Sequence, residues 1–252
     1  MNLNDYCFPV VERKVAVHNG QSNQIDLGNT ETFLPGSYKA IVRGDTNELI
    51  SVVKQSYQVV PNETLIYQLM EELEKIDTSY EIEDSHSFVE NSRMRIQIAF
   101  PEILVNDGRS DIALSMYLHN SYDLSEGIRI FWGAIRGICS NGMVFGKVLG
   151  RFYRKHTKGF QINNLHQELS RTADLLPRVQ DRINDLDSIP VTNELCESVE
   201  NGLGKRFAKK VLETDHETQW KLFNAITYLI SHVVHQRQRA RYQIATSRIF
   251  GL

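Results

Sequence analysis

Clustered cations are the residues of this 252-residue chain that are best suited to chemistry. Residues 127–160 contain seven Lys or Arg and no Asp or Glu, and Phe and Tyr are interleaved among the cations. Lys and Arg bind phosphate oxygens, and aromatic rings stack on nucleobases. This stretch therefore favours a polyanionic ligand, and single-stranded DNA is the ligand that we predict.

A second acid-free stretch lies at the end of the chain. Residues 231–252 contain four arginines and no acid, and Arg237 and Arg241 stand one helical turn apart. Tyr117 and Tyr153 are the candidates for stacking on bases. The two acid-free stretches supply the predicted nucleic-acid-binding residues. The first group, from residues 127–160, is Arg136, Lys147, Arg151, Tyr153, Arg154, Lys155 and Lys158, and the second group, from the end of the chain, is Arg237 and Arg241.

An acidic stretch offers the cations a different partner. Residues 62–90 carry nine acids and one lysine, so the cations could pair with this stretch inside the fold. On this interpretation Glu81 and Glu83 lie across neighbouring strands from Arg93 and Arg95. Clustering along a chain does not establish clustering in space. Both interpretations therefore stay open at the level of the sequence.

A nucleophile and a metal site are the two catalytic possibilities. Cys139 precedes a Ser-Asn-Gly turn, but as a nucleophile it needs a histidine base beside it. The alternative, which we favour, is a small buried cysteine at a turn. His232 and His235 have a spacing that suits a metal, but the sequence offers no third ligand nearby. We therefore predict no metal and no cofactor.

An enzyme remains one of the rival functions. Its centre would be Cys139 or the polar set Asn120, Asp123 and His156. The glycines of residues 127–150 do not match the spacing of a dinucleotide-binding or phosphate-binding loop. The sequence thus holds no coherent catalytic motif, and we predict that the protein is not an enzyme.

The composition predicts an ordinary globular protein. Hydrophobic residues make up 41% of the chain and charged residues 23%, and the net charge is −3. A chain that is not basic throughout must build any polyanion site by local clustering. Three distant cysteines indicate a reducing compartment, and we expect neither a signal peptide nor a membrane span. The expected location is the cytoplasm of a bacterial host cell.

The first two-thirds of the sequence read as a sheet with one packed helix. We expect residues 1–35 to be irregular and short strands to lie at 38–43 and 50–60. Pro61-Asn62-Glu63 then predicts a helix start, with Asn62 as its cap. Residues 92–100 and 112–119 alternate apolar with other side chains, which predicts an antiparallel hairpin. Residues 127–148 suggest a strand, a Ser140-Asn141-Gly142 turn, and a further strand or helix.

The last third of the sequence has helical periodicity. Apolar residues recur at spacings of three and four from Leu165, and Pro177 is expected to divide this run into two helices. Thr192 or Asn193 suits the next helix cap, and a last long helix is expected at 216–247. We predict an α+β fold with an irregular segment at 1–35, a sheet domain at 36–160 and a helical region at 161–252.

Several short motifs are spread along the chain: residues 57–63 (YQVVPNE), 118–123 (LHNSYD) and 130–143 (IFWGAIRGICSNGM), followed by His156 and by residues near the end that include Trp220 and Arg239. In these motifs the chain resembles a phage and plasmid family known as domain of unknown function 932. The resemblance spreads from about residue 38 to 248, so residues 1–35 receive no role. More distantly, the chain is similar to single-strand annealing proteins of the Rad and Redβ types. That similarity implies a ring or filament that binds single-stranded DNA without metal or nucleotide.

We therefore expect a protein that binds or anneals single-stranded DNA in phage or plasmid DNA metabolism. The expected partner is single-stranded DNA, and a homo-oligomer is compatible with this function. The alternative function that involves no catalysis is that of a phage protein that binds a host defence or replication protein. The acidic stretch at 62–90 and the leucine stripe from Leu165 would then form the working surfaces.

Overall fold

The fold is the α+β architecture that the sequence predicts, with an antiparallel sheet followed by helices. The computed structural model describes residues 3–17, 32–33, 37–84, 87–90, 92–136, 141–145, 149, 151–154, 156, 162 and 165–252. The central sheet has the strand order β11-β10-β9-β8-β6, with β12 also pairing with β10 and β7 with β8. Its strands are β6 (Glu81–Ile82), β7 (Phe88–Glu90), β8 (Arg93–Asn106), β9 (Asp111–Ser121), β10 (Ile128–Arg136), β11 (Asn141–Val144) and β12 (Arg151–Arg154).

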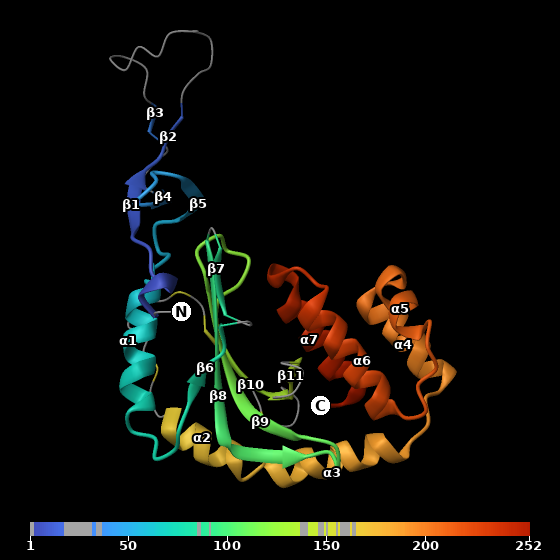
Figure 1. The fold of residues 1–252 in the computed structure, drawn as a ribbon. Coiled ribbons are helices and arrows are strands. Elements are labelled where there is room, and N and C mark those ends of the chain that lie inside the picture. Colours follow the sequence, from blue (N-terminus) through green and yellow to red (C-terminus); the bar gives the residue numbers. More distant parts are fainter. Residues whose placement is uncertain are drawn as a thin grey trace.

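The helices surround this sheet (Figure 1). α1 lies along one side, α2 and α3 run beneath the sheet, and α6 and α7 lie on the other side with α4 and α5 beyond them. None of the described helices is long and apolar enough to cross a membrane. The helices are α1 (Asn62–Leu73), α2 (Leu165–Ala173), α3 (Leu176–Ser188), α4 (Asn193–Leu203), α5 (Lys205–Leu212), α6 (Gln219–His232) and α7 (Gln236–Phe250).

The predicted hairpin is confirmed as β8 and β9. Ile96 lies opposite Leu118 and Ile98 opposite Met116, and these four side chains are buried. Strand β8 is longer than expected, because it continues through Pro101 to Asn106. The register shifts between Phe100 and Leu104, and such a bulge is a position where a strand tolerates proline.

The small N-terminal sheet was not predicted in full. Strand β1 (Val10–Lys14) pairs with β4 (Tyr38–Arg43), which pairs with β5 (Leu49–Lys54). A 3-10 helix (Leu3–Tyr6) precedes β1, and two-residue strands β2 (Ala16–Val17) and β3 (Thr32–Phe33) also pair. The expectation of an irregular segment at 1–35 is therefore wrong at β1, whose ladder depends on a partner more than 20 residues away.

The helix breaks agree with the sequence except at the end of the chain. Pro177 lies in the first turn of α3, so it separates α2 from α3 as predicted, and Thr192 caps α4 by accepting a hydrogen bond from the backbone N–H of Leu195. The expected single helix at 216–247 is instead α6 and α7, which pack together. Val233 falls in the break between them and is 56% exposed.

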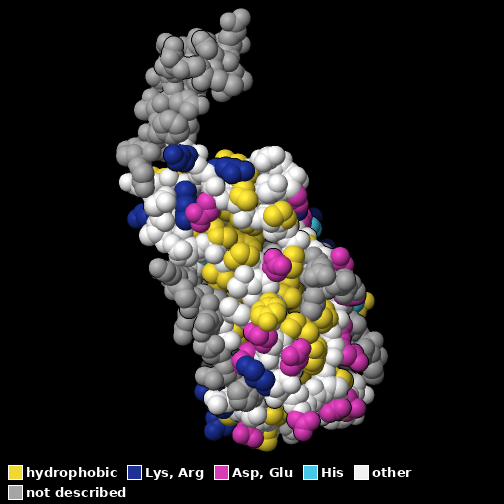
Figure 2. Space-filling view, turned by 90° about the vertical axis from the view of Figure 1, so that its left-hand side faces the viewer, with side chains coloured by type: hydrophobic (Ala, Val, Ile, Leu, Met, Phe, Trp, Pro, Cys, Tyr) yellow, Lys and Arg dark blue, Asp and Glu magenta, His cyan; other side chains and the backbone are white. Residues whose placement is uncertain are grey.

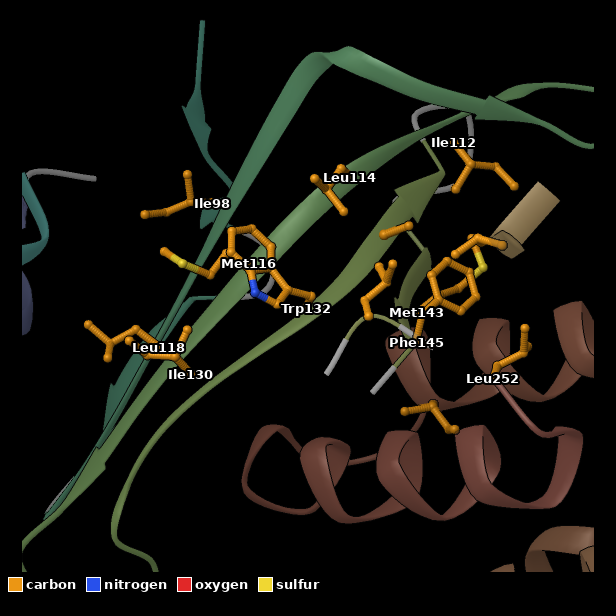
Figure 3. Packing of buried hydrophobic residues seen from close by; sticks show 14 of the residues in the cluster. Ile98, Ile112, Leu114, Met116, Leu118, Ile130, Trp132, Met143, Phe145 and Leu252 are labelled. Carbon is orange, nitrogen blue, oxygen red and sulfur yellow. The ribbon is translucent and has the colours of Figure 1, made fainter. Parts of the chain in front are cut away.

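One hydrophobic core joins the sheet to helices from both ends of the chain. Along β8, β9 and β10 alternate side chains face this core, among them Ile98, Met116 and Trp132 (Figure 3). Phe223 of α6 and Phe250 of α7 belong to the same buried cluster. The other face of these strands, called the polar face below, carries buried polar side chains such as Arg95 and His119 beside a small apolar cluster of Tyr117, Phe131 and Val144.

Gly133 lets β11 lie close against β10. A Cβ atom at this position would lie 2.0 Å from the carbonyl oxygen of Met143 and 2.9 Å from Cε2 of Tyr117. Either distance is far inside van der Waals contact, so only glycine fits between the two strands. Asn141 and Gly142, expected in a turn, belong to β11.

Candidate functional site

The polar face of the central sheet carries a row of basic side chains. Arg95 of β8 lies directly opposite His119 of β9, and His119 lies opposite Arg129 of β10. The register of β8 and β9 puts Arg93, Arg95, Tyr117 and His119 on one face of the hairpin. Neighbouring strands therefore position the row, because side chains directly opposite in an antiparallel ladder share a face.

Arg95 is the most unusual member of this row, because its side chain is only 1% exposed. Nη2 donates to Oε1 of Gln243 on α7 at 2.9 Å, and the guanidinium carbon lies 4.5 Å from the ring centroid of Tyr117. Nε has no hydrogen-bond partner. Burial lowers the pKa of the guanidinium to about 10, so it remains a cation at neutral pH.

His119 is neutral in this environment. Its side chain is buried, and burial lowers the pKa of the imidazole to about 4 although Glu126 opposes the shift. Nδ1 lies 3.3 Å from a carboxylate oxygen of Glu126, so Nδ1 carries the proton and donates. Nε2 is then an acceptor, and it has no hydrogen-bond partner. An oriented imidazole beside a carboxylate could accept a proton, but no hydroxyl or thiol of the described residues is hydrogen-bonded to Nε2.

A second polar cluster joins three segments that carry the family resemblance. Asn62, at the start of α1, does not cap the helix as expected; its side chain accepts from Nδ2 of Asn120 at 2.8 Å and from the hydroxyl of Tyr122 at 3.1 Å. The ring of His156 stacks on Tyr57, and its Nδ1 accepts from the backbone N–H of Val60 at 3.4 Å. These contacts fasten residues 57–62 to the end of β9.

This second cluster does not form the catalytic set that the sequence suggested as a rival. Asp123 turns to Arg93 and Ser92, with an Arg93 Nε to Oδ2 distance of 2.9 Å, and so it does not join Asn120 and His156. Burial lowers the pKa of His156 to about 4. Cys139 lies outside the described residues. Among the described residues no group of three His, Cys, Asp or Glu could hold a metal ion.

A third cluster fixes α6 to the sheet through a buried ion pair. Arg136, at the end of β10, pairs with Asp107, whose side chain is completely buried. Nη2 of Arg136 also donates to Oδ1 of Asn224 at 3.0 Å, and Nε1 of Trp220 donates to Asp107 at 2.8 Å. Burial alone would raise the pKa of the Asp107 carboxyl, but the hydrogen bonds from Arg136 and Trp220 hold it at about 2.

The structure places the predicted DNA-binding residues in very different surroundings. Arg136 and Tyr117 are buried, and the guanidinium of Arg136 is committed to the ion pair, so neither side chain is available to a strand on the surface. Arg237 and Arg241 are exposed, and Arg237 pairs with Glu90 at 2.8 Å. The backbone of Arg151, Tyr153 and Arg154 forms β12, while their side chains and Lys147, Lys155 and Lys158 lie outside what the structure describes.

The proposed internal pairing of the acidic stretch is only partly present. Glu81 lies opposite Ala99, and Arg93 lies opposite Glu90, so the expected pairing of Glu81 and Glu83 with Arg93 and Arg95 is wrong. The Arg237–Glu90 pair does join the acidic stretch to the acid-free C-terminal region. It is half-exposed at both ends, so it contributes roughly 0–1 kcal/mol.

An exposed basic surface was missed in the sequence. Helix α5 carries four exposed cations and no acid. It touches α7 through the rings of Phe207 and Tyr242, whose centroids are 5.0 Å apart, and α7 adds exposed Arg241. Four cations in eight residues are a visible signal in the sequence KRFAKKVL. These five cations together are called the basic helical surface: Lys205, Arg206, Lys209, Lys210 and Arg241.

The comparisons with known proteins place the chain in a family without an assigned activity. The family model described as a domain of unknown function (DUF932) matches residues 49–248. No curated protein and no solved structure matches, so the similarity to Rad-type and Redβ-type annealing proteins finds no support. Because the match covers most of the chain, the protein belongs to the DUF932 family.

Proposed function

We propose that this member of the DUF932 family binds single-stranded nucleic acid without regard to sequence. The basic helical surface is the observation that carries the proposal. Helix α5 has four exposed cations in eight residues, and residues 219–252, which form α6 and α7, contain no Asp or Glu. Repulsion among exposed cations is relieved when phosphates bind and condensed counterions leave the strand.

The predicted tract at 127–160 is the second part of this proposal. Its strand β12 pairs with β10 at the edge of the central sheet. Backbone contacts carry no base information, so affinity should be similar on all sequences. The proposal includes annealing, in which two complementary strands that are each bound to the protein pair with one another.

Fluorescence anisotropy with a labelled single-stranded oligonucleotide at several salt concentrations tests the proposal. Each phosphate contact contributes roughly −0.7 to the slope of log affinity against log salt. The triple variant Arg206→Ala, Lys209→Ala and Lys210→Ala should therefore flatten the slope by about 2. Alanine preserves the helix, so the change should act on binding alone.

A matched control removes the same charge from a distant surface. Arg13, Lys14 and Lys54 are exposed on β1 and β5, and their replacement by alanine should leave the slope unchanged. The variant Arg151→Ala, Arg154→Ala and Lys155→Ala tests the predicted tract in the same titration. Absence of binding by the wild-type protein at low salt would end the nucleic-acid proposal.

An acidic and apolar face supports the second candidate function, binding to another protein. Figure 2 shows the side of the molecule that carries α1, where acidic and hydrophobic side chains are intermixed. Exposed Glu63, Glu71 and Glu74 flank Tyr67, whose side chain is 64% exposed. This face suits a basic partner, such as a host defence or replication protein. It becomes the leading candidate if no nucleic acid binds.

A further inference from the structure

We propose that Arg95 belongs to an interior binding site for a small phosphate ion or phosphate monoester, between the polar face of the sheet and α7. The site is separate from the basic helical surface and does not depend on the proposed nucleic-acid binding. Four observations support it, and they concern the charge of Arg95, a second cation, two unpaired acceptors, and the proton that the ligand must carry.

Arg95 makes no ion-pair contact among the described residues, although the negative charge of Glu126 acts on its guanidinium. No described carboxylate forms an ion pair with it, and the acid-free residues 127–160 cannot supply one either. The only acids outside the described residues are Asp26 and Glu31, in the connection between β2 and β3. A buried cation that no carboxylate contacts is disfavoured, so an anion bound in contact with Arg95 would reduce this penalty.

The second cation is Arg239 of α7, whose Nε donates to the backbone oxygen of Val234 at 3.0 Å. The positive charge of Arg239 acts on Arg95, and Arg239 is itself half-buried with a lowered pKa caused by burial. Arg239 stands one helical turn before Gln243, the residue that accepts from Arg95, so both lie on the helix face turned to the sheet. Two cations that repel each other in a partly dry setting are typical of an oxyanion site.

Two buried acceptors of this face are also unpaired. Nε2 of His119 and Oε1 of Gln97 are buried without hydrogen-bond partners, as is the donor Nε of Arg95. Gln97 uses Nε2 to donate to Oγ of Ser115 at 3.2 Å, and His119 uses Nδ1 to donate to Glu126. A ligand must therefore offer both acceptor oxygens and an O–H donor.

A protonated phosphate meets this requirement. Hydrogen phosphate at pH 7 carries anionic oxygens for Arg95 and an O–H for His119 or Gln97, and a phosphate monoester does so in its singly charged form, below its second pKa of about 6. Sulfate at neutral pH has no O–H, and a phosphodiester of a nucleic-acid backbone has none either. The arrangement of donors and acceptors thus selects phosphate over sulfate, and a free or terminal phosphate over a chain.

Thermal unfolding in phosphate and in sulfate at matched ionic strength and pH 7 tests this inference. At a hundredfold excess over its Kd, phosphate should raise Tm by roughly 5–10 °C. Sulfate should give a clearly smaller rise. A nucleoside monophosphate is compared with inorganic phosphate in the same assay, and the larger rise identifies the source of the phosphate group.

Two variants of α7 distinguish a site from a general salt effect. Arg239→Gln keeps Arg95 in place and should remove most of the phosphate-dependent rise, while Arg248→Gln, an exposed change on the same helix outside the basic helical surface, should leave it intact. Isothermal titration calorimetry of the folded wild-type protein with phosphate should show saturable binding. Equal rises in phosphate and sulfate, no rise, or an unchanged rise in Arg239→Gln would each overturn the inference.

Discussion

Replacing Asp107 by asparagine should destabilise the protein more than any surface charge change. The substitution leaves the guanidinium of Arg136 buried without a carboxylate, and breaking one side of a buried ion pair costs about 3–5 kcal/mol. The pKa of Asp107 gives an independent magnitude. Its value of about 2, compared with the ordinary 3.8, corresponds to about 2.5 kcal/mol of preference for the charged form in the folded state.

The pH dependence of this contribution follows from the direction of the shift. A carboxylate with a lowered pKa stabilises the fold above its ordinary pKa, and the contribution is lost as the pH falls from 3.8 towards 2. At pH 7 the pair is fully charged, so the whole effect of Asp107→Asn should be present. Below pH 2 the wild type and the variant should converge.

Urea unfolding followed by far-ultraviolet circular dichroism measures the free energy directly. A matched control is Glu168→Gln, which breaks an exposed pair with Arg171 on α2 and should cost roughly 0–1 kcal/mol. Trp220→Phe removes only one hydrogen bond to Asp107 and should cost an intermediate amount. A loss below about 1 kcal/mol for Asp107→Asn would show that the pair does not fasten α6 to the sheet.

Three further predictions concern stability and binding. Gly133→Ala should destabilise strongly, because its Cβ would overlap the backbone of β11, and a wild-type urea midpoint would contradict the close approach. The buried imidazoles of His119 and His156 are neutral in the folded protein, with pKa values of about 4. The free energy of unfolding should therefore fall as the pH drops from 6.5 to 4, by up to about 3 kcal/mol for each histidine. Urea unfolding at pH 7 and at pH 4.5 measures this fall, and equal stability at the two pH values would contradict it. Tyr228 is 49% exposed on acid-free α6, so Tyr228→Ala should weaken single-strand binding by roughly 1–3 kcal/mol without changing the salt slope, while Tyr67→Ala on the acidic face should have no effect.

The hairpin was predictable because its information is local. Period-two alternation over β8 and β9 determines which side chains face the core, and the register then follows from the buried face. The continuation of β8 beyond Pro101 was not predictable, because proline normally ends a strand unless a bulge removes the need for its N–H. That bulge depends on the partner strand.

The functional surroundings of the cations were harder to predict than the fold. Arg136 lies in an acid-free stretch of sequence, yet its partner Asp107 is 29 residues away at the tip of the hairpin. The break between α6 and α7 has no proline or glycine to announce it, and Asn62 looks like a helix cap although its side chain joins Asn120 instead. In each case a tertiary contact overrides the local signal.

The two unlike faces of the central sheet also bear on how the strands find one another. A slip of β8 by a single residue would turn Arg95 and Gln97 towards Leu118 and Met116, and would move Ile96 to the polar side. A guanidinium forced among aliphatic side chains is far more costly than a misplaced methyl group. The polar face therefore raises the free energy of a mispaired hairpin, because such a hairpin cannot bury its apolar side chains without also burying a charge among them.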